Sequence, residues 1–416
     1  MKLNFKRIFP LVLAFLSIVS ASFATDGYFL TGYGTKQQGQ GGAGVAKPGD
    51  SLAGATNPAG LFLVGNRFDI GLTLFRPNRS AIITSPSPAA GPYDANRVTN
   101  FELPELSYSL QYRPNLALGV AIFGNGGLNT SYKTPIPLLG STRGGVDIDQ
   151  VFISPTLAYK AGAHNYFGIA ANIAVQRFAA EGLQYIEAIS SDSAHVTNNG
   201  YSYAGGGGVR VGWLGELNRA VSVGATYQSR TYMGKFDRYR GLFAERGGFD
   251  VPANFAGGAA VKLGSKATLL FDEERILYGT VKSIANTLDS TSSLGSDSGP
   301  GFGWHDINVS KAGLDYDVNP SLTLRGGYNH GGVPFDSSQT FFNLLAPAVT
   351  KDHLHVGATW ATKSGKEISF AYIHAFNNTV DGVNSIPPTY GGGNENLSMY
   401  QNSFQIAFGW NRDKKE

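Results

Sequence analysis

The stretch that decides the fold is SFQIAFGW, Ser403–Trp410, near the end of the chain. Its even-numbered positions carry Phe, Ile, Phe and Trp, and its odd-numbered positions carry Ser, Gln, Ala and Gly. Because successive side chains of a β-strand point to opposite faces, this order gives one large apolar face and one small or polar face. The stretch therefore predicts a strand that lies between two different environments.

The same period of two recurs along most of the chain. We expect about fourteen such strands, each near the length that a tilted strand needs to cross a bilayer. In chain order, the expected strands cover 66–76, 101–112, 116–124, 148–160, 165–180, 201–213, 220–232, 250–263, 266–275, 304–318, 321–330, 352–363, 366–377 and 400–411. The chain is therefore predicted to be all-β, with a transmembrane antiparallel β-barrel over residues 66–411.

The links between these strands alternate in length. After the even-numbered strands they are short, as in RPN (113–115), AGAH (161–164) and VNP (318–320). After the odd-numbered strands they include the long polar stretches 77–100, 276–303, 331–351 and 378–399. Aromatic residues also gather near the short-turn ends of even-numbered strands, at Tyr112, Tyr159, Trp213, Tyr316, Trp360 and Trp410. Short turns on one side, long loops on the other and an aromatic girdle predict an outer-membrane barrel.

A soluble β-sandwich is the alternative, since its strands alternate in the same way. It would not require aromatics in register at one end, and a charged fraction of 15% is low for a soluble protein. Lipid offers no hydrogen bonds to free backbone groups, so a sheet in a membrane closes on itself. A ring of about fourteen strands is too wide to be filled by its own side chains and therefore encloses a lumen.

The first 24 residues have the pattern of a signal peptide. MKLNFKR is basic, IFPLVLAFLSIV is apolar, and SFA (22–24) offers small residues for cleavage after Ala24. A membrane anchor is the alternative, but the apolar run is short for a span. At the other end, residues 412–416 form a short charged tail. The chain has no cysteine, and a net charge of +3 without a Lys/Arg run does not favour nucleic-acid binding.

Residues 25–65 precede the first expected strand and are rich in Gly and Ala. We expect them to fold as a plug, or hatch, inside the lumen, with a short helix capped by Asp50 or Ser51. A periplasmic tail is the alternative. The segment contains GQGGAG (Gly39–Gly44), which has the G-x-G-x-x-G spacing of a dinucleotide loop. No buried strand precedes these glycines, so we interpret them as flexible, closely packed backbone of the plug and expect no cofactor.

Several motifs resemble those of one family. GYFLTGYGTKQQGQGGAGVA (27–46), followed by NPAGL (57–61), resembles the N-terminal hatch of the FadL family of outer-membrane transporters for long-chain fatty acids and other hydrophobic compounds. VAIFGNGGLNTSY (120–132) is similar to the third strand of that family, with Asn125 and Gly126 in place of its usual Pro-aromatic pair. FNLLAPAVTKDHLHVGATW (342–360) and KEISFAYIHAF (366–376) resemble its late-barrel region.

The resemblance implies a passive transporter in the outer membrane of a Gram-negative bacterium, without enzymatic activity. Extracellular loops would capture a long-chain fatty acid or a similar hydrophobic molecule. After the hatch rearranges, the molecule would leave sideways into the membrane at a kink in the third strand. Uptake of aromatic or alkane hydrocarbons is the alternative within the family. The expected partners are the hydrophobic ligand, outer-membrane lipid and lipopolysaccharide, and the barrel is expected to act as a monomer.

Two sets of residues are candidates for these steps. The capture surface is expected on loops 181–200 and 233–249, at Leu183, Tyr185, Ile186, Phe236, Leu242 and Phe243. Ordinary loop packing is the alternative role for each of these residues. The arginines that could meet a carboxylate are Arg238, Arg240 and Arg246. The gate is expected at Asn57, Pro58 and Ala59 in the hatch and, where glycines permit a bulge or kink, at Gly124, Asn125, Gly126 and Gly127.

Other kinds of chemistry are less favoured. His353 and His355 share one strand face, by parity the lumen side, but two histidines without a third ligand nearby in sequence do not predict a metal site. FDEERI (271–276) is interpreted as a solvated loop edge. An outer-membrane enzyme is not favoured, since no G-x-S-x-G motif is found. A non-specific porin is the closer rival, and it would show a charged constriction and no hatch.

Overall fold

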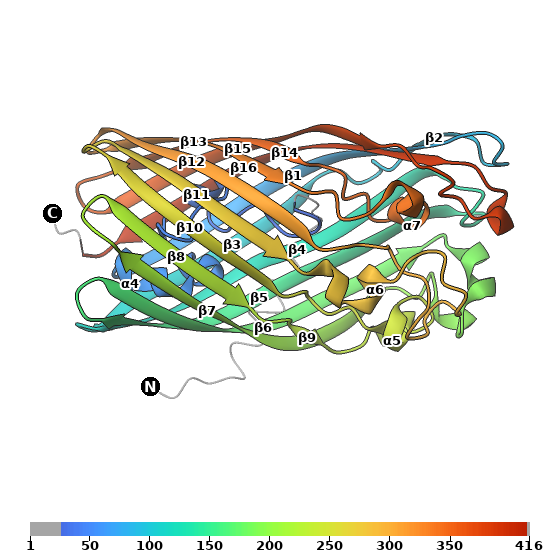
Figure 1. Ribbon diagram of the computed structural model, residues 1–416, viewed down its shortest axis with the longest axis horizontal. Helices are drawn as coiled ribbons and strands as arrows, with labels where there is room; N and C mark the ends of the chain where they lie inside the picture. The colour runs from blue at the N-terminus through green and yellow to red at the C-terminus, as the bar shows by residue number, and fades with distance from the viewer. Residues whose placement is uncertain (1–25, 414–416) are drawn as a thin grey trace.

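The computed structural model describes residues 26–413, which form a closed antiparallel β-barrel (Figure 1). These residues contain sixteen strands, and fourteen of them form the ring, which closes because β1 pairs with β16. The other two, β2 (Gly91–Asp94) and β9 (Tyr232–Met233), pair with β1 and β7 at the long-loop end. The expected signal peptide, residues 1–24, lies outside the described residues.

The ring strands follow one another around the barrel in chain order. They are β1 (Arg67–Ile83), β3 (Phe101–Arg113), β4 (Leu116–Pro135), β5 (Arg143–Ala161), β6 (Asn165–Glu181), β7 (Ser202–Glu216), β8 (Val221–Gln228), β10 (Asn254–Leu263), β11 (Ala267–Ile276), β12 (Ile307–Asn319), β13 (Leu322–Gly331), β14 (Asp352–Ala361), β15 (Lys366–Val380) and β16 (Glu395–Asn411).

The prediction of about fourteen membrane strands is confirmed, with tight turns at one end of the barrel and long loops at the other (Figure 1). Four strands run at least five residues further toward the loops than expected. β1 and β4 end at Ile83 and Pro135, and β5 and β16 begin at Arg143 and Glu395. In these extensions apolar side chains also occupy the inner face, as Leu397 and Met399 of β16 do, so the sequence pattern fades there while the backbone pairing continues.

The two faces of the strands carry different residues, as the alternation predicts. On β16, Phe404 is 47% exposed and its neighbour Gln405 only 4%. Exposed aromatic side chains lie at the short-turn ends of the strands, at Tyr112, Tyr159, Tyr316, Trp360 and Trp410. An apolar outer face with aromatics at its edge suits lipid, and the polar inner face lines the lumen.

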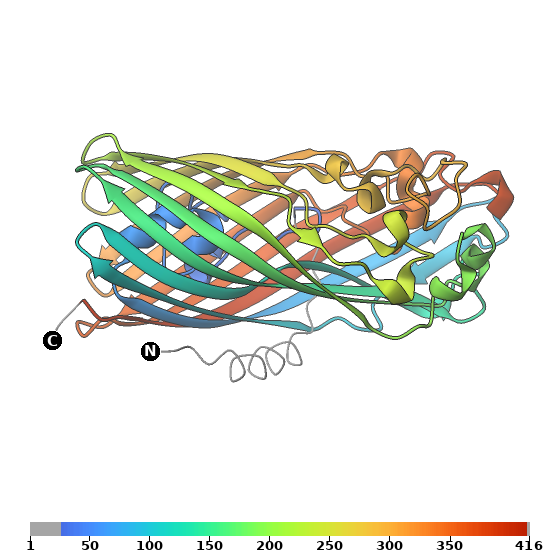
Figure 2. The same cartoon turned by 90° about the horizontal axis from the view of Figure 1, so that it is seen from below.

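Residues 26–65, here called the N-terminal segment, lie inside the barrel toward its short-turn end (Figures 1 and 2). Nearly all of them are buried. The expected short helix is present, but the prediction of its cap was wrong, because Leu52 is the N-cap residue of the helix Ala53–Thr56. Asp50 and Ser51 have other partners: Asp50 Oδ1 accepts a hydrogen bond from the Leu52 backbone at 3.0 Å, and Ser51 binds the barrel wall.

Helical structure in the described part of the chain is short. The α-helical turns are α2 (Thr35–Gln38), α3 (Ala53–Thr56), α4 (Leu61–Val64), α5 (Ala244–Gly247), α6 (Lys282–Ala285) and α7 (Thr340–Asn343). The 3₁₀ turns are η1 (Pro58–Gly60), η2 (Gln184–Ile189), η3 (Ser193–His195), η4 (Asp237–Tyr239), η5 (Tyr278–Thr280), η6 (Ser337–Gln339) and η7 (Pro388–Tyr390). Between residues 26 and 413, no helix has the length and apolar character that a membrane span requires.

Candidate functional site

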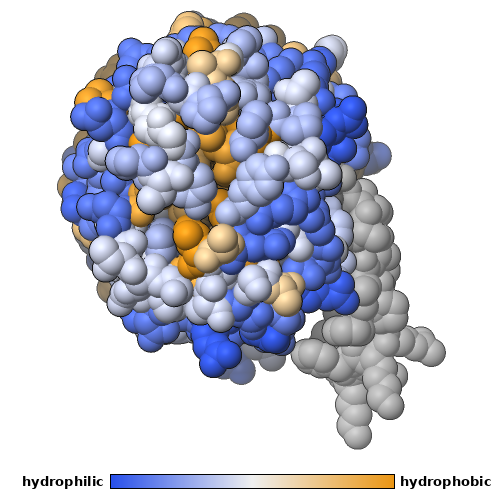
Figure 3. Space-filling view, turned by 90° about the vertical axis from the view of Figure 1, so that its right-hand side faces the viewer, coloured by the Kyte–Doolittle hydropathy of each residue, from blue (hydrophilic) through white to orange (hydrophobic). Residues whose placement is uncertain are grey.

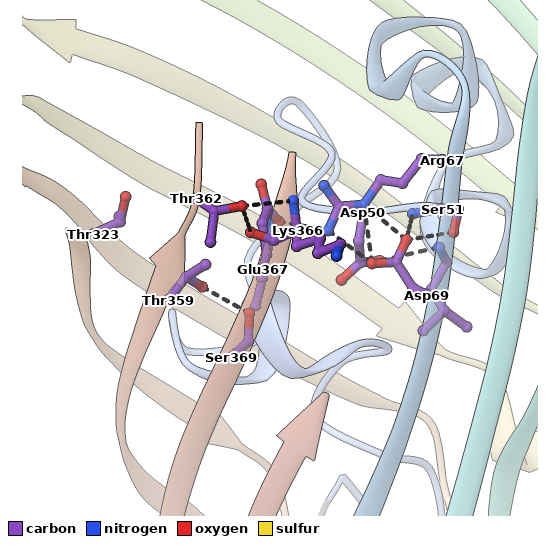
Figure 4. Close-up of polar contacts among 12 residues, drawn as sticks. Asp50, Ser51, Arg67, Asp69, Thr323, Thr359, Thr362, Lys366, Glu367 and Ser369 are labelled. Carbon is purple, nitrogen blue, oxygen red and sulfur yellow. Dashed lines mark hydrogen bonds and ion pairs between the residues drawn. The ribbon is translucent and has the colours of Figure 1, made fainter. Parts of the chain in front are cut away.

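Buried ion pairs and hydrogen bonds fix the N-terminal segment to the barrel wall. Figure 4 shows Ser51 of this segment beside Asp69 and Arg67 of the wall. Lys36 Nζ lies 2.5 Å from Glu367 Oε2 in β15, and Arg67 in β1 donates to the same oxygen at 2.7 Å. Arg67 also pairs with Asp69 at 2.7 Å, and Asp69 Oδ2 accepts a hydrogen bond from the Ser51 backbone N–H at 3.0 Å. The four charged side chains are at most 10% exposed, so each charge depends on its partners for stabilisation.

The glycine-rich loop is arranged around a carboxylate of the barrel wall. The backbone N–H groups of Gly44 and Val45 donate to Asp272 Oδ2 in β11, at 2.6 and 2.9 Å. The interpretation of FDEERI as a solvated loop edge was therefore wrong, because these residues lie in β11 and Asp272 points into the lumen. Gly41 has a φ of +76°, and a Cβ at this position would collide with the backbone carbonyl of Ala312. Glycines thus let the loop lie directly against the wall.

The third ring strand, β4, carries a bulge at Asn125. Its neighbours Gly124 and Gly126 pair with consecutive residues of β5, so Asn125 has no partner in that register. Instead, the Asn125 side chain joins two elements: its Oδ1 accepts a hydrogen bond from the Tyr33 hydroxyl at 2.9 Å, and its Nδ2 donates to Gln150 Oε1 at 3.1 Å. The bulge is therefore in direct contact with the N-terminal segment.

A gap in strand pairing lies beside this bulge. Pairing of β4 with β3 stops at Ile122, although both strands continue toward the loops. Above that point, Phe29 forms an antiparallel bridge with Gly126, and Gly127 N donates to the carbonyl of Tyr28 at 3.2 Å. A Cβ at position 126 would collide with that carbonyl. The tip of the N-terminal segment, residues 26–33, thus takes the place of the missing strand partner.

The Asn57–Ala59 motif lies elsewhere, against β6 and β7. Asn57 Nδ2 donates to the carbonyls of Val45 at 2.8 Å and Trp213 at 2.9 Å, and its Oδ1 accepts from Ala59 N at 3.1 Å. The hydrogen bonds from the N-terminal segment to Gly124–Gly127 come from Tyr28 and Tyr33 instead. The sequence carries no signal for either tyrosine, because the Tyr33–Asn125 contact joins positions 92 residues apart and the Tyr28–Gly127 contact joins similarly distant parts of the chain.

An apolar pocket lies among the extracellular loops. Its space, including the part open to solvent, is about 570 Å³. The lining residues are Leu128, Val146, Ile148, Phe178, Ile186, Leu242, Phe243, Phe249, Ser283, Leu294, Pro300, Gly301, Phe302, Phe342, Leu345 and Ala346. Ser283 is the only polar residue among them, and none carries a charge. A lining of this composition suits an apolar ligand.

The six residues expected to form the capture surface take three different positions. Ile186, Leu242 and Phe243 line the apolar pocket. Leu183 and Phe236 are fully buried in the same hydrophobic core but do not line the pocket. Tyr185 is 52% exposed and also lies outside the lining.

The three candidate arginines do not line this pocket. Arg240 Nε pairs with Asp192 Oδ2 at 2.6 Å. Arg238 donates to the carbonyl of Asn199 at 2.8 Å, and the Arg246 backbone N–H donates to Gly295. A carboxylate inside the pocket would therefore lie apart from these cations.

A larger groove opens at the extracellular surface beside the pocket. Figure 3 shows hydrophobic residues in the hollow between the polar loop tips at this end of the barrel. The groove is lined mainly by loop residues 288–293, 338–342 and 384–390, and it shares Phe342 and Pro300 with the pocket. These loops carry no signal in the sequence, because an isolated loop sequence does not show which other loops it meets.

Two carboxyl groups of the N-terminal segment have raised pKa values. Burial raises the pKa of Asp26 to about 7, and burial together with the nearby Asp69 charge raises the pKa of Asp50 to about 6. Both values lie above the ordinary 3.8, so the folded protein holds extra protons between about pH 4 and pH 7. The contribution of these groups to stability is greatest at acid pH and falls as the pH rises through this window.

The two histidines face the lumen, as strand parity predicts. Both are buried, and His355 Nδ1 lies 2.5 Å from the carbonyl oxygen of Gln38. Within residues 26–413, no group of three or more His, Cys, Asp or Glu side chains is placed to hold a metal ion. The histidine contact instead fixes the helical turn α2 to the wall.

The whole chain can now be compared with known proteins. Residues 16–399 match the sequence profile of the family described as "Outer membrane protein transport protein (OMPP1/FadL/TodX)". The chain belongs to the FadL/TodX family. Members of the FadL/TodX family are outer-membrane β-barrels that transport hydrophobic compounds, which places this chain in the outer membrane of a Gram-negative bacterium.

Solved structures of FadL/TodX-family proteins share the fold. The P. putida toluene transporter TodX has a TM-score of 0.71 at 18% identity, covering 92% of this chain and 99% of that chain. The Ralstonia pickettii toluene transporter TbuX has a TM-score of 0.66 at 18% identity, covering 92% and 98%. A Pseudomonas aeruginosa FadL homologue has a TM-score of 0.72 at 14% identity, covering 93% and 100%. No curated protein sequence matches the chain.

Proposed function

We propose that this protein takes up uncharged hydrophobic molecules, about the size of a monoaromatic hydrocarbon, by passive diffusion across the outer membrane. The observation that carries the proposal is the loop pocket, in which Ser283 is the only polar lining residue. The similarity in fold to the toluene transporters TodX and TbuX supports this substrate class.

The proposed route has three steps. The surface groove collects the molecule, which then passes Phe342 and Pro300 into the apolar pocket. When the tip of the N-terminal segment leaves the bulge in β4, the molecule exits sideways between β3 and β4 into the membrane. Each buried CH₂ is stabilised by about 0.8 kcal/mol, so lipid is favoured over a watery lumen as the destination. Asn57–Ala59 would then act at a distance, by holding the base of the segment while its tip moves.

Long-chain fatty acids are the second candidate substrates. An ionised carboxylate in an uncharged pocket would lose its hydration without gaining a cation, which is unfavourable. We therefore favour neutral compounds. We also infer that the protein is a transporter without enzymatic activity or cofactor, and that it acts as a single barrel surrounded by outer-membrane lipid and lipopolysaccharide.

Uptake into vesicles tests this assignment. Vesicles with a lipopolysaccharide outer leaflet, which hinders apolar molecules, should accumulate labelled toluene faster with the purified protein than without it. Unlabelled toluene should compete at least about tenfold better than oleate. Planar bilayers with the same protein should show little steady conductance, because the N-terminal segment fills the lumen. A large, steady open channel would support the rival porin function, and stronger competition by oleate would support fatty acids.

Replacing Phe243 by alanine tests the pocket itself. The Phe243 ring lines the pocket and lies 4.6 Å from Phe178 and 5.0 Å from Phe249, measured between ring centroids. We expect the affinity for toluene, measured by displacement of a fluorescent ligand, to fall about tenfold. Tyr185→Ala is the matched control, since this exposed residue does not line the pocket. Equal affinities of the two variants would remove the pocket from the proposed route.

A further inference from the structure

Arg79 in β1 closes part of the gap between β3 and β4 with its side chain. Its guanidinium donates to the carbonyl of Val98 at 2.5 Å, on the chain leading into β3. On the other side it donates to both the backbone carbonyl and the side-chain oxygen of Asn129 in β4. The guanidinium carbon lies 5.7 Å from the centre of the Phe101 ring. One side chain thus connects both edges of the gap.

Beyond Ile122, the last residue of β4 that pairs with β3, different groups bridge the gap at successive positions along β4. At Gly126 and Gly127 the closing groups belong to the backbone of the N-terminal segment. At Ser131 they belong to the backbone of Ala95 and Arg97. At Asn129, between these two levels, the hydrogen bonds across the gap come from the Arg79 side chain. A side chain can swing away by rotation, whereas the backbone contacts above it require the chain to move.

The cation at this position is costly. Arg79 is 1% exposed, and it forms no ion pair with any Asp or Glu of the described residues. Burying a charge without an ion-pair partner in contact is unfavourable, and carbonyl oxygens and the more distant charges of Asp94 and Asp147 compensate only in part. An apolar side chain would fill the same space at lower cost but would not join the two edges. A surface groove touches Val98, Phe101 and Asn129, so the residues that hold the guanidinium lie directly beneath the outer surface.

We propose that Arg79 sets the height of the lateral outlet between β3 and β4 and thereby limits the size of the molecules released. The inference rests on the proposed lateral release and adds a specificity-determining residue to it. When the tip of the N-terminal segment leaves, the opening extends from Ile122 up to the Arg79 bridge. Loss of the bridge extends the opening to the next contact, at Ser131.

Variants of Arg79 in the full-length protein test this inference. Arg79→Met keeps an unbranched side chain but removes the hydrogen bonds, and Arg79→Lys keeps the charge. Arg76→Met is the control, since Arg76 is an exposed arginine of the same strand. Uptake of pyrene relative to toluene should rise about tenfold in Arg79→Met, as expected for the loss of a charged hydrogen bond. Arg79→Lys should give an intermediate ratio, and Arg76→Met should match the natural protein. Gel migration before and after heating shows which variants are folded.

A distance measurement tests the outlet without transport. Spin labels at the exposed positions Glu102 in β3 and Lys133 in β4 report on the two edges of the gap. Their distance distribution should broaden in Arg79→Met and stay unchanged in Arg76→Met. An unchanged uptake ratio or an unchanged distribution in folded Arg79→Met overturns the inference. If the natural protein moves toluene no faster than empty vesicles do, the proposed function fails, and the spin labels alone decide the role of Arg79.

Discussion

Cross-linking the tip of the N-terminal segment to β4 is expected to abolish uptake and leave ligand binding unchanged. Tyr33 and Asn125 are joined by a 2.9 Å hydrogen bond across the bulge. Replacing both by cysteine and joining them with a bifunctional thiol reagent about as long as a tyrosine side chain would prevent the tip from leaving the gap. Because the natural chain has no cysteine, the reagent has no other thiol to react with. Uptake of labelled toluene should then fall to the level of empty vesicles.

The control is a reagent with a reducible linker. Reduction should restore uptake, and each single-cysteine variant treated with the reagent should keep its uptake. Toluene binding, measured separately by ligand displacement, should be the same before and after cross-linking, because the loop pocket lies outside the cross-linked region. Continued uptake by fully cross-linked protein would show that molecules do not leave between β3 and β4.

The second large effect is expected from Glu367→Ala. This change leaves Lys36 without its carboxylate partner and leaves Arg67 with Asp69 alone. Removing one partner of a buried ion pair costs about 3–5 kcal/mol of unfolding free energy, because the remaining charge stays buried. The loss should be visible in denaturant titrations of the protein in vesicles. Since Lys36 holds the helical turn α2 to β15, planar-bilayer conductance should rise as well.

Asp94→Ala provides the contrast. Asp94 pairs with Lys133 at 2.7 Å on the extracellular rim, where both side chains are about half exposed. Exposed pairs contribute about 1 kcal/mol or less, and the released lysine returns to water. This variant should therefore keep both its stability and its low conductance. A similar small loss in both variants would mean that the ion pairs of Lys36 and Arg67 do not hold the N-terminal segment in place.

The membrane strands could be predicted because the residue types on the two faces of each strand differ in polarity. Phe404 and Gln405 face lipid and lumen on neighbouring positions, and this local contrast is present in the sequence before any folding. The extensions of β4 to Pro135 and of β5 back to Arg143 lack such a contrast, since most of their consecutive residues are buried on both faces. Their pairing depends on backbone hydrogen bonds, which any sequence can form.

The candidate site could be predicted only in outline. The sequence singled out the glycines around Asn125, and the structure has a bulge at that position. It did not indicate that Tyr33 would meet this bulge, or that Phe342 from a distant loop would border the same pocket as Phe243. Apolar residues in loops look alike whether they pack against the core or line a cavity. Which of them converge depends on the order of strands around the ring.

The sequence by itself determined the class of fold, the number of membrane strands and the side on which the long loops lie. These properties follow from alternation and turn length, which act over a few residues. The tertiary structure alone decided that the glycine-rich loop surrounds Asp272, that Glu367 holds Lys36, and that Arg79 joins the edges of an unpaired gap. Each of these contacts forms because closing the ring brings distant residues to one lumen, where buried charges and free backbone groups must find partners.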